Sequence, residues 1–123
     1  FVLLGDLNND PDDGEGQKSG IHALLTHMLI NDPQQQSEGA VLAAERLGGA
    51  NIKHAGNPAL DTVEWDADIG NMRVDYALPS AGLMVIDSGV FWPSPSSPYG
   101  YLIEEGRNGA SNHRMVWVDI VVD

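Results

Sequence analysis

The sequence contains no cysteine. Disulfides and thiolate metal sites are therefore excluded, and cysteine usage gives no indication of the redox compartment. Long hydrophobic runs are missing as well, because no apolar stretch approaches the roughly 20 residues that a membrane-spanning helix requires. We therefore predict that the chain has no partnership with a membrane.

Basic residues are scarce. Six lysines and arginines stand against 18 aspartates and glutamates, which gives a formal net charge of −12 at pH 7. A field of this sign repels nucleic acid and anionic lipid. A small phosphoester is therefore a more natural partner than polymeric DNA, and any substrate that carries phosphate would need a bound cation to help it approach.

The rest of the composition is that of an ordinary globular protein. The chain has 123 residues, of which 42% are hydrophobic and 20% are charged, and this length corresponds to a single domain. It opens on Phe1, with neither an initiator methionine nor a signal-like segment. This start predicts a piece of a longer protein.

The first residues carry the strongest local signal. Residues 1–4 form an apolar run that stops at Gly5, which is typical of a buried strand, and Asp6 and Asn8 follow directly. One interpretation is that a rigid strand delivers two polar side chains to a site. The other is that these side chains only form turns at the end of the strand.

Two amphipathic segments predict helices. The first has Ser19 as its N-cap and an apolar face over residues 21–29, with members three and four apart. The second begins at Ser37 or Glu38 and ends before a pair of glycines. Both helices are short enough to cover one face of a small sheet.

Two further segments invite a metal-binding interpretation, and the spacing argues against both. In the acidic segment 10–16, alignment with a calcium loop would place Pro11 and Gly20 at ligand positions, so we predict a solvated loop. His22 and His27 lie five residues apart rather than the four that lets two imidazoles share a metal on a helix. We predict that these histidines are surface or partly packed residues.

The second half of the chain is rich in strand signals. Residues 72–79 and 83–92 predict an antiparallel hairpin, and residues 115–122 predict a final strand. Residues 107–111 predict a flexible approach to that strand. Trp65 stands in an irregular stretch, and we expect it to cover the edge of the core rather than line a pocket.

Three polar motifs stand at strand ends, with the sequences GDLN (5–8), RVDY (73–76) and SNH (111–113). In this order they resemble the second half of the endonuclease/exonuclease/phosphatase superfamily, the metal-dependent phosphoesterases related to pancreatic DNases and abasic-site endonucleases. The segments 70–80 and 87–93 further resemble a bacterial, usually exported, branch. That resemblance alone implies a secreted or periplasmic location.

The resemblance implies an α+β fold, namely half of a four-layered α/β sandwich, with a mainly antiparallel sheet and two helices on one face. Residues 1–123 would form a single domain or the C-terminal half of the family's longer domain. A lone half would leave one face of its sheet without a partner layer, and apolar surface of that kind is normally covered by association. We therefore expect a partner, either the missing N-terminal half or a second copy in a homodimer.

The resemblance also implies roles for individual residues. Asp6 matches the carboxylate that activates or orients the attacking water, and Asn8 matches the amide beside it. Asp75 matches the carboxylate that orients the catalytic histidine, and His113 matches that histidine, which contacts the scissile phosphate. With Mg²⁺ or Mn²⁺, such a set supplies a positioned water, a clamp on the phosphate oxygens and neutralisation of the leaving group.

Two departures from the family pattern affect the metal site. Asn112 stands where the family usually has the aspartate of a Ser-Asp-His motif, and an uncharged amide binds a hard cation more weakly than a carboxylate does. Asn112 and Asp6 are the metal ligands that the resemblance leaves in this chain. The family's principal glutamate ligand belongs to the other half and has no counterpart here.

Three hypotheses follow from the sequence. The first is a metal-dependent phosphoesterase that hydrolyses a phosphodiester or phosphomonoester with an activated water. The second is a non-catalytic fragment or binding module that has an incomplete metal site and is stabilised by self-association. The third treats Asp6, Asp75 and His113 as satisfied polar groups at strand ends.

Overall fold

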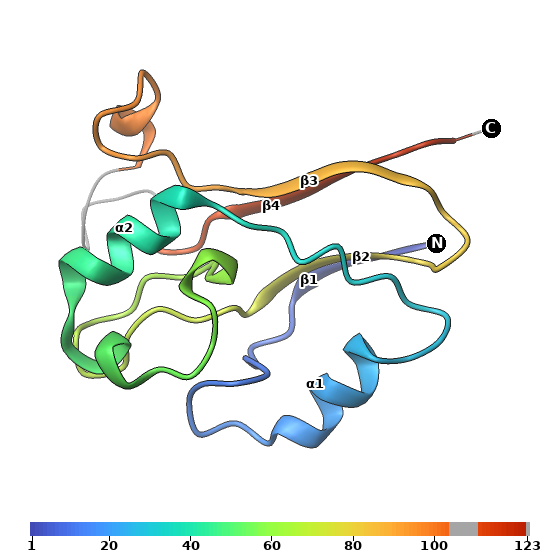
Figure 1. Cartoon of the computed structure of the whole chain (residues 1–123), viewed down its shortest axis with the longest axis horizontal. Coiled ribbons are helices and arrows are strands. Elements are labelled where there is room, and N and C mark those ends of the chain that lie inside the picture. Colours follow the sequence, from blue (N-terminus) through green and yellow to red (C-terminus); the bar gives the residue numbers. More distant parts are fainter. Residues whose placement is uncertain (104–110, 123) are drawn as a thin grey trace.

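The computed structural model describes residues 1–103 and 111–122 (Figure 1). Most of the predicted flexible approach at 107–111 lies outside the described residues. The helices are α1 (Lys18–Leu25) and α2 (Glu38–Leu47), with 3₁₀ helices at Gly49–Lys53, Pro58–Leu60 and Gly100–Leu102. The strands are β1 (Val2–Asp6), β2 (Asp75–Pro79), β3 (Val85–Phe91) and β4 (Met115–Ile120). The predicted α+β class is confirmed.

The described strands form two antiparallel pairs rather than one sheet. Strand β1 pairs with β2 and strand β3 pairs with β4. The two pairs run side by side, and α2 with the first two 3₁₀ helices lies at one end of them (Figure 1). The prediction of a hairpin between residues 72–79 and 83–92 is therefore wrong, because β2 and β3 belong to different sheets.

The second edge of β2 explains this error. The segment that follows α1 already covers that edge, because the backbone N–H of Asn31 donates to the carbonyl of Pro79 at 2.8 Å. The buried side chain of Gln35 donates through Nε2 to the carbonyl of Ala77 at 2.5 Å. With β1 on one edge and this segment on the other, β2 has no free edge for β3. Adjacency in the sequence, on which the hairpin prediction rested, could not show this competition.

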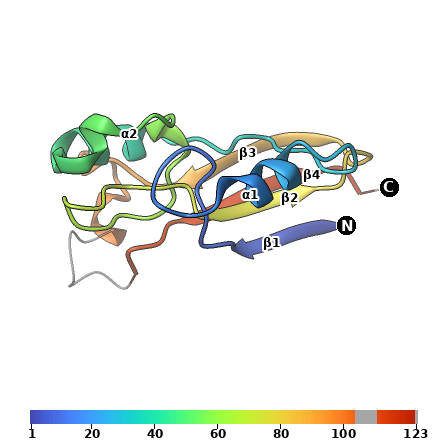
Figure 2. The same cartoon turned by 90° about the horizontal axis from the view of Figure 1, so that it is seen from below.

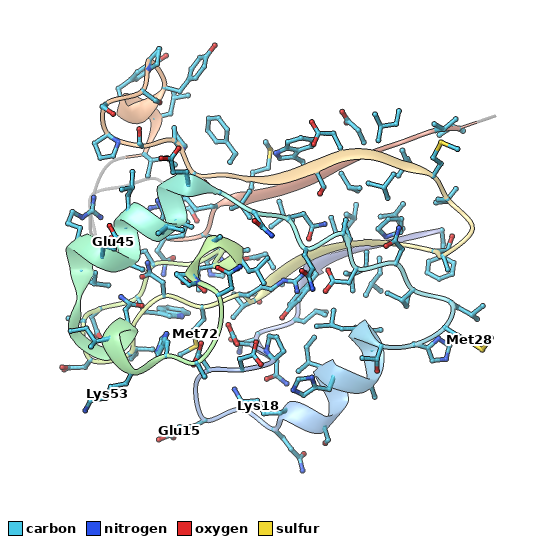
Figure 3. All side chains as sticks on the ribbon, viewed as in Figure 1. Glu15, Lys18, Met28, Glu45, Lys53 and Met72 are labelled. Carbon is cyan, nitrogen blue, oxygen red and sulfur yellow. The ribbon has the colours of Figure 1, made fainter. Side chains whose placement is uncertain are left out.

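Helix α1 is shorter than predicted and packs on the first sheet. Ser19 lies inside the helix, whose N-cap is Gln17, and the helix ends where Thr26 donates to the carbonyl of His22 through both its N–H and its hydroxyl. Met28, placed on the apolar face by the sequence pattern, is 85% exposed and projects outward beyond the helix (Figure 3). Ile21 is the buried residue of α1, and it packs with Tyr76 and Leu78 of β2.

Helix α2 begins and ends as predicted. The hydroxyl of Ser37 accepts a hydrogen bond from the N–H of Gly39 at 3.1 Å, and Gly48 ends the helix with a φ of 61°. The helix packs on the second sheet, where Ala40 and Ala43 contact Val90 and Trp92 in a small apolar core. Figure 2 shows α2 on the side of the molecule opposite β1.

A short extended segment joins the two sheets. Val63 forms isolated bridges with both Met72 and His113. On one side of it the N–H of Thr62 donates to the carbonyl of Met72 at 2.8 Å, and on the other the N–H of Arg114 donates to the carbonyl of Thr62 at 2.7 Å. Segment 61–64 therefore lies between the approach to β2 and the approach to β4, and it fixes these two approaches relative to each other.

The acidic segment 10–16 is more ordered than a solvated loop. Asp10 is only 5% exposed, and its carboxylate accepts hydrogen bonds from the N–H groups of Asp12, Asp13 and Arg73. Residues 14–16 are exposed, as predicted. The prediction of a solvated loop is wrong for Asp10, because backbone N–H groups there take the place of water.

Within residues 1–103 and 111–122, the structure contains no helix that is long and apolar enough to cross a membrane.

Candidate active site

The register of the first sheet brings two of the predicted site residues together. Asp6, at the end of β1, lies directly opposite Asp75, at the start of β2. Asp6 is exposed, and its Oδ1 accepts a hydrogen bond from the N–H of Asn8 at 2.7 Å. Asn8 adopts a positive φ of 47°, which asparagine tolerates better than most residues. The turn that the sequence offered as an alternative does form, and it holds the Asp6 carboxylate beside Asp75.

His113 is held by Asp75. Its Nδ1 lies 2.9 Å from Oδ2 of Asp75, and the histidine side chain is 31% exposed. An ionised carboxylate can only accept hydrogen bonds, so the proton of a neutral His113 belongs on Nδ1. The Nε2 atom is then left without that proton on the outer side of the ring, where it can contact a ligand.

Thr62, which the sequence analysis missed, fixes Asp75 in turn. Its hydroxyl donates to Oδ2 of Asp75 at 2.8 Å, and its oxygen accepts from the N–H groups of Val74 and Asp75 at 3.0 Å each. Thr62 is fully buried. The threonine therefore orients the carboxylate that orients His113, and no sequence signal singles it out.

The turn before β4 positions the backbone of His113. The hydroxyl of Ser111 accepts a hydrogen bond from the N–H of His113 at 3.0 Å. The guanidinium of Arg114 donates to the carbonyl of Ser111 at 2.7 Å and lies 4.7 Å from the ring centre of Trp92. The histidine is thus held from its side chain by Asp75 and from its backbone by the residues around it.

Trp65 is the second residue whose place the sequence did not reveal. Its ring meets the His113 ring edge to face, with the ring centres 6.0 Å apart. It is half-buried, and its contact with His113 adds to the expectation that it covers the edge of the core, which stays a prediction. Tyr76, by contrast, is a buried packing residue, and its hydroxyl donates to the carbonyls of Asn9 and Arg73.

Three of the predicted site residues come together in the structure. Asp6, Asp75 and His113 each offer a ligand atom, and these atoms all lie within 4.8 Å of one another. Asn112 is exposed and its carbonyl accepts from the N–H of Glu64 at 2.9 Å, whereas its predicted role as a metal ligand stays a prediction. The same is true of the side chain of Asn8.

The donor set fits a hard divalent cation. Mg²⁺ and Mn²⁺ prefer carboxylate oxygens, and two carboxylates with an imidazole provide both charge and coordinating atoms. Because Oδ2 of Asp75 already accepts from Thr62 and His113, Asp6 is the carboxylate with more freedom to bind a cation. Asp6 is also the more exposed of the two carboxylates, so a cation from solution reaches it more easily.

An oriented Asp–His pair beside an exposed carboxylate, on an α+β fold, has the composition of a hydrolytic centre that uses a divalent cation. The sequence profile of the endonuclease/exonuclease/phosphatase family matches residues 1–113, so the chain belongs to this family. Members of the family are generally metal-dependent phosphoesterases and nucleases. No curated protein and no solved structure gives a significant match to the chain.

Proposed function

We propose that the protein hydrolyses a small phosphomonoester or phosphodiester with the help of Mg²⁺ or Mn²⁺. The observation that carries this proposal is the convergence of Asp6, Asp75 and His113 within 4.8 Å at the ends of three different strands or strand approaches. Isolated polar groups at strand ends have no reason to converge in this way, so the geometry supports a site over the third hypothesis of unrelated residues.

His113 contacts the phosphate in this proposal. With Nδ1 directed to Asp75, the Nε2 atom is the part of the ring that meets substrate. In the protonated form Nε2 donates a hydrogen bond to a non-bridging phosphate oxygen and stabilises the negative charge that develops there. Asp75 holds the orientation of the ring and stabilises its protonated form, which is the role of the carboxylate in hydrolytic triads.

Asp6 orients the nucleophile. An exposed carboxylate next to the phosphate accepts a hydrogen bond from a water and aligns it for attack on phosphorus. The Asn8 amide assists by holding the same water or the phosphate, while its N–H fixes Asp6. Asp6 and Asn112 would hold the divalent cation, which, when bound, neutralises charge on the phosphate and on the leaving oxygen.

The net charge supports a small substrate. At −12 the chain repels a polyanion over its whole length, whereas a small phosphoester meets only the field close to the site. A divalent cation on Asp6 reverses the local charge there. We therefore propose a small phosphoester as substrate and do not propose nucleic acid.

A second candidate function is supported by exposed apolar surface. Phe1, directly before β1, is 68% exposed and Leu4 on β1 is 69% exposed, and Ile86 on β3 and Met115 on β4 are also exposed. Two carboxylates and one imidazole fill only part of the shell of a hard cation. We propose, as the alternative, a half site or binding module that acts only when exposed apolar side chains of this kind are covered by the other half of the family's domain or by a second copy.

Hydrolysis of a chromogenic phosphodiester and phosphomonoester, with Mg²⁺, Mn²⁺ or a chelator, tests the proposal. We expect turnover that needs the metal, and we expect His113→Ala to lower it at least 10³-fold, about the loss seen when a catalytic group is removed. Asn112→Asp should raise turnover or metal affinity, because it restores a charged ligand. Asp119→Asn, on the exposed part of β4, is the matched control and should leave turnover unchanged.

Each outcome separates the candidates. Metal-dependent turnover that is lost in His113→Ala supports a working site in this chain. Turnover that rises more steeply than protein concentration, with dimers in sedimentation, supports a site completed by a second copy. Absence of turnover in the parent and in Asn112→Asp, at every concentration, overturns the first candidate and leaves the binding module.

A further inference from the structure

We propose that a second site, separate from the Asp6–Asp75–His113 group, binds a small organic cation through the carboxyl group of Asp61. A cavity of about 290 Å³ lies between α2 and the chain that follows it, and Asp61 lines it. None of Asp6, Asp75 and His113 lines this cavity, so the proposal does not depend on phosphoester hydrolysis.

The walls of the cavity suit the apolar part of such a ligand. Val41 and Ala44 of α2, Ile52 of the first 3₁₀ helix and Pro58 of the second contribute apolar surface. Ile52 is 82% exposed at the mouth. A ligand with a short hydrocarbon body would cover this exposed isoleucine, which gains free energy from removal of apolar surface from water.

Asp61 supplies the recognition element. Its side chain is buried, at 6% exposure, yet none of the hydrogen bonds of the described residues involves its carboxyl group. Its oxygens are not among the enclosed polar atoms that lack a partner, so they reach the space of the cavity, where water or a ligand can meet them. A cationic N–H donor in the cavity would supply the missing partner.

The neighbouring carboxylates are already used. Asp13 also lines the cavity, and its two oxygens accept hydrogen bonds from the N–H groups of Ala55 and Gly56 at 2.7 and 2.9 Å. Asp10 is bonded to three backbone N–H groups in the same way. Of these three aspartates, Asp61 is therefore the one whose carboxyl group remains available to a ligand in the cavity, which the exposed Glu45 of α2 also lines.

The charged groups around Asp61 come from several elements. Burial, then the charges of Asp10 and Asp13, raise the pKa of Asp61 to about 8. The side chain of Lys18 donates to the carbonyls of Asp10 and Asp13, and Arg73, at a small recess on the other side of Asp61, is paired with Asp32. The cavity itself also receives Glu45 from α2 and His54, whose Nε2 lies 3.1 Å from the carbonyl of Ile69.

Lys53 is not among the residues that line the cavity, and Figure 3 shows its side chain projecting away from the body of the protein. The local field is therefore negative, and the arrival of a cation would favour the ionised form of Asp61. Binding and loss of the Asp61 proton are consequently coupled, and this coupling gives the proposal a distinctive signature.

The chemistry favours an organic cation over a metal ion. Among the described residues, Asp10, Asp13 and Asp61 do not bring their ligand atoms together closely enough to form a metal group of the kind seen at Asp6, Asp75 and His113. A hard cation needs several convergent oxygens, whereas an alkylammonium needs one carboxylate and an apolar wall. The cavity offers the second combination.

The test uses n-butylammonium as the probe, followed through the amide NMR signals of Ala55 and Gly56 at the cavity wall. We expect saturable shifts, and we expect the affinity to rise about tenfold between pH 6 and pH 7, because the fraction of ionised Asp61 rises about tenfold there. Asp61→Asn, which preserves shape and removes the charge, should weaken binding at least tenfold. Asp119→Asn, at an exposed carboxylate on β4, should change the affinity less than twofold.

Two matched probes complete the design. n-Butanol has the same hydrocarbon body without the charge, and it should bind at least tenfold more weakly. MgCl₂ alone should not produce the same shifts at Ala55 and Gly56. Equal binding of n-butanol, unchanged binding in Asp61→Asn, an affinity that is flat between pH 6 and pH 7, or displacement of the probe by stoichiometric Mg²⁺ would each overturn the proposal.

Discussion

Two groups of acidic side chains lie on opposite sides of segment 61–64. On one side Asp75, with Asp6 and His113, is held by Thr62, and on the other Asp61 faces the charges of Asp10 and Asp13. Thr62 and Asp61 are neighbours in an extended segment, and successive side chains of such a segment point to opposite faces. Segment 61–64 thus contributes one residue to each of the two groups of acidic side chains.

The two groups differ in what their oxygens do. In the first group, Asp6 is exposed, and one of its oxygens accepts a hydrogen bond within a local turn. In the second, the Asp10 and Asp13 carboxylates are occupied by backbone N–H groups from elsewhere in the chain. The same residue type is therefore accessible to water and ligands in one group and bound by the backbone in the other.

The largest effect should come from removing charge on the exposed side. Asp6→Asn keeps the acceptor for the N–H of Asn8 but removes the carboxylate that orients water and binds the cation. We expect phosphoester turnover to fall about 10³-fold, with the free energy of unfolding changed by less than about 0.5 kcal/mol. Steady-state kinetics and denaturant unfolding measure the two quantities. A loss of stability that matches the loss of activity would show that Asp6 is structural. Asp6 would then not differ in role from Asp10 and Asp13.

The same kind of change on the buried side should act on stability instead. Asp10→Ala removes the acceptor of three backbone N–H groups and leaves them in a buried region. We expect the free energy of unfolding to fall by about 4 kcal/mol, since each lost hydrogen bond to a charged group costs about 1.5–3 kcal/mol and relief of repulsion with Asp61 offsets part of this. Guanidinium titration of Asp10→Ala beside Asp12→Ala, at the exposed neighbouring position, measures it. Equal stability of the two variants would contradict the structural role of Asp10.

The pH dependence of stability should come from the buried side through Asp61. Its pKa is about 8 in the folded protein against an ordinary value of 3.8, so between these values the folded state holds one more proton than the unfolded state. The free energy of unfolding therefore falls as the pH rises from about 4 to about 8. Asp61→Asn should remove this slope and stabilise the protein at pH 8 by about 3 kcal/mol, an order-of-magnitude value. Unfolding of both proteins at several pH values provides the measurement, and parallel profiles would show that another group titrates.

The features of the fold that could be predicted from the sequence are those that depend on residues close together in the chain. The presence of the first strand, the second helix with its Ser37 cap, the α+β class and the family were predicted correctly, because each rests on a local pattern. The burial of the first strand was predicted wrongly, because Leu3 and Leu4 are exposed on β1 and an apolar run does not show whether another layer covers it. The hairpin was predicted wrongly because the edge of β2 is claimed by Asn31 and Gln35, about 40 residues away in the chain. Local alternation of apolar residues carries no information about that competition.

The candidate site shows the same division. Asp6, Asp75 and His113 could be singled out because each stands in a short motif at a strand end, and the register of β1 with β2 then places Asp6 opposite Asp75. Thr62 and Trp65 were missed because a threonine or tryptophan in an irregular segment has many ordinary explanations. Their importance depends on segment 61–64 bridging Met72 and His113, which is a tertiary contact.

The smallest expected effect concerns the residue that joins the two sides. Thr62→Val preserves the shape of the side chain but removes the hydroxyl that bonds to Oδ2 of Asp75 and to two backbone N–H groups. We expect a loss of about 2 kcal/mol in the free energy of unfolding, because buried donors lose their acceptor. We also expect kcat to fall about tenfold with little change in KM, because Asp75 and His113 lose part of their orientation.

Thr62→Ser is the matched control, since it keeps the hydroxyl and loses only a methyl group. Restoration of kcat in Thr62→Ser, together with a pH profile of kcat that shifts in Thr62→Val and returns in Thr62→Ser, would identify Thr62 as a positioning residue for the Asp75–His113 pair. A purely structural role predicts another pattern, in which both variants lose stability in proportion to buried volume and the pH profile of kcat stays fixed. Asp61 directly precedes Thr62 in the chain. The butylammonium affinity of Thr62→Val therefore shows whether the loss of the Thr62 hydroxyl affects the two sides of segment 61–64 together or independently.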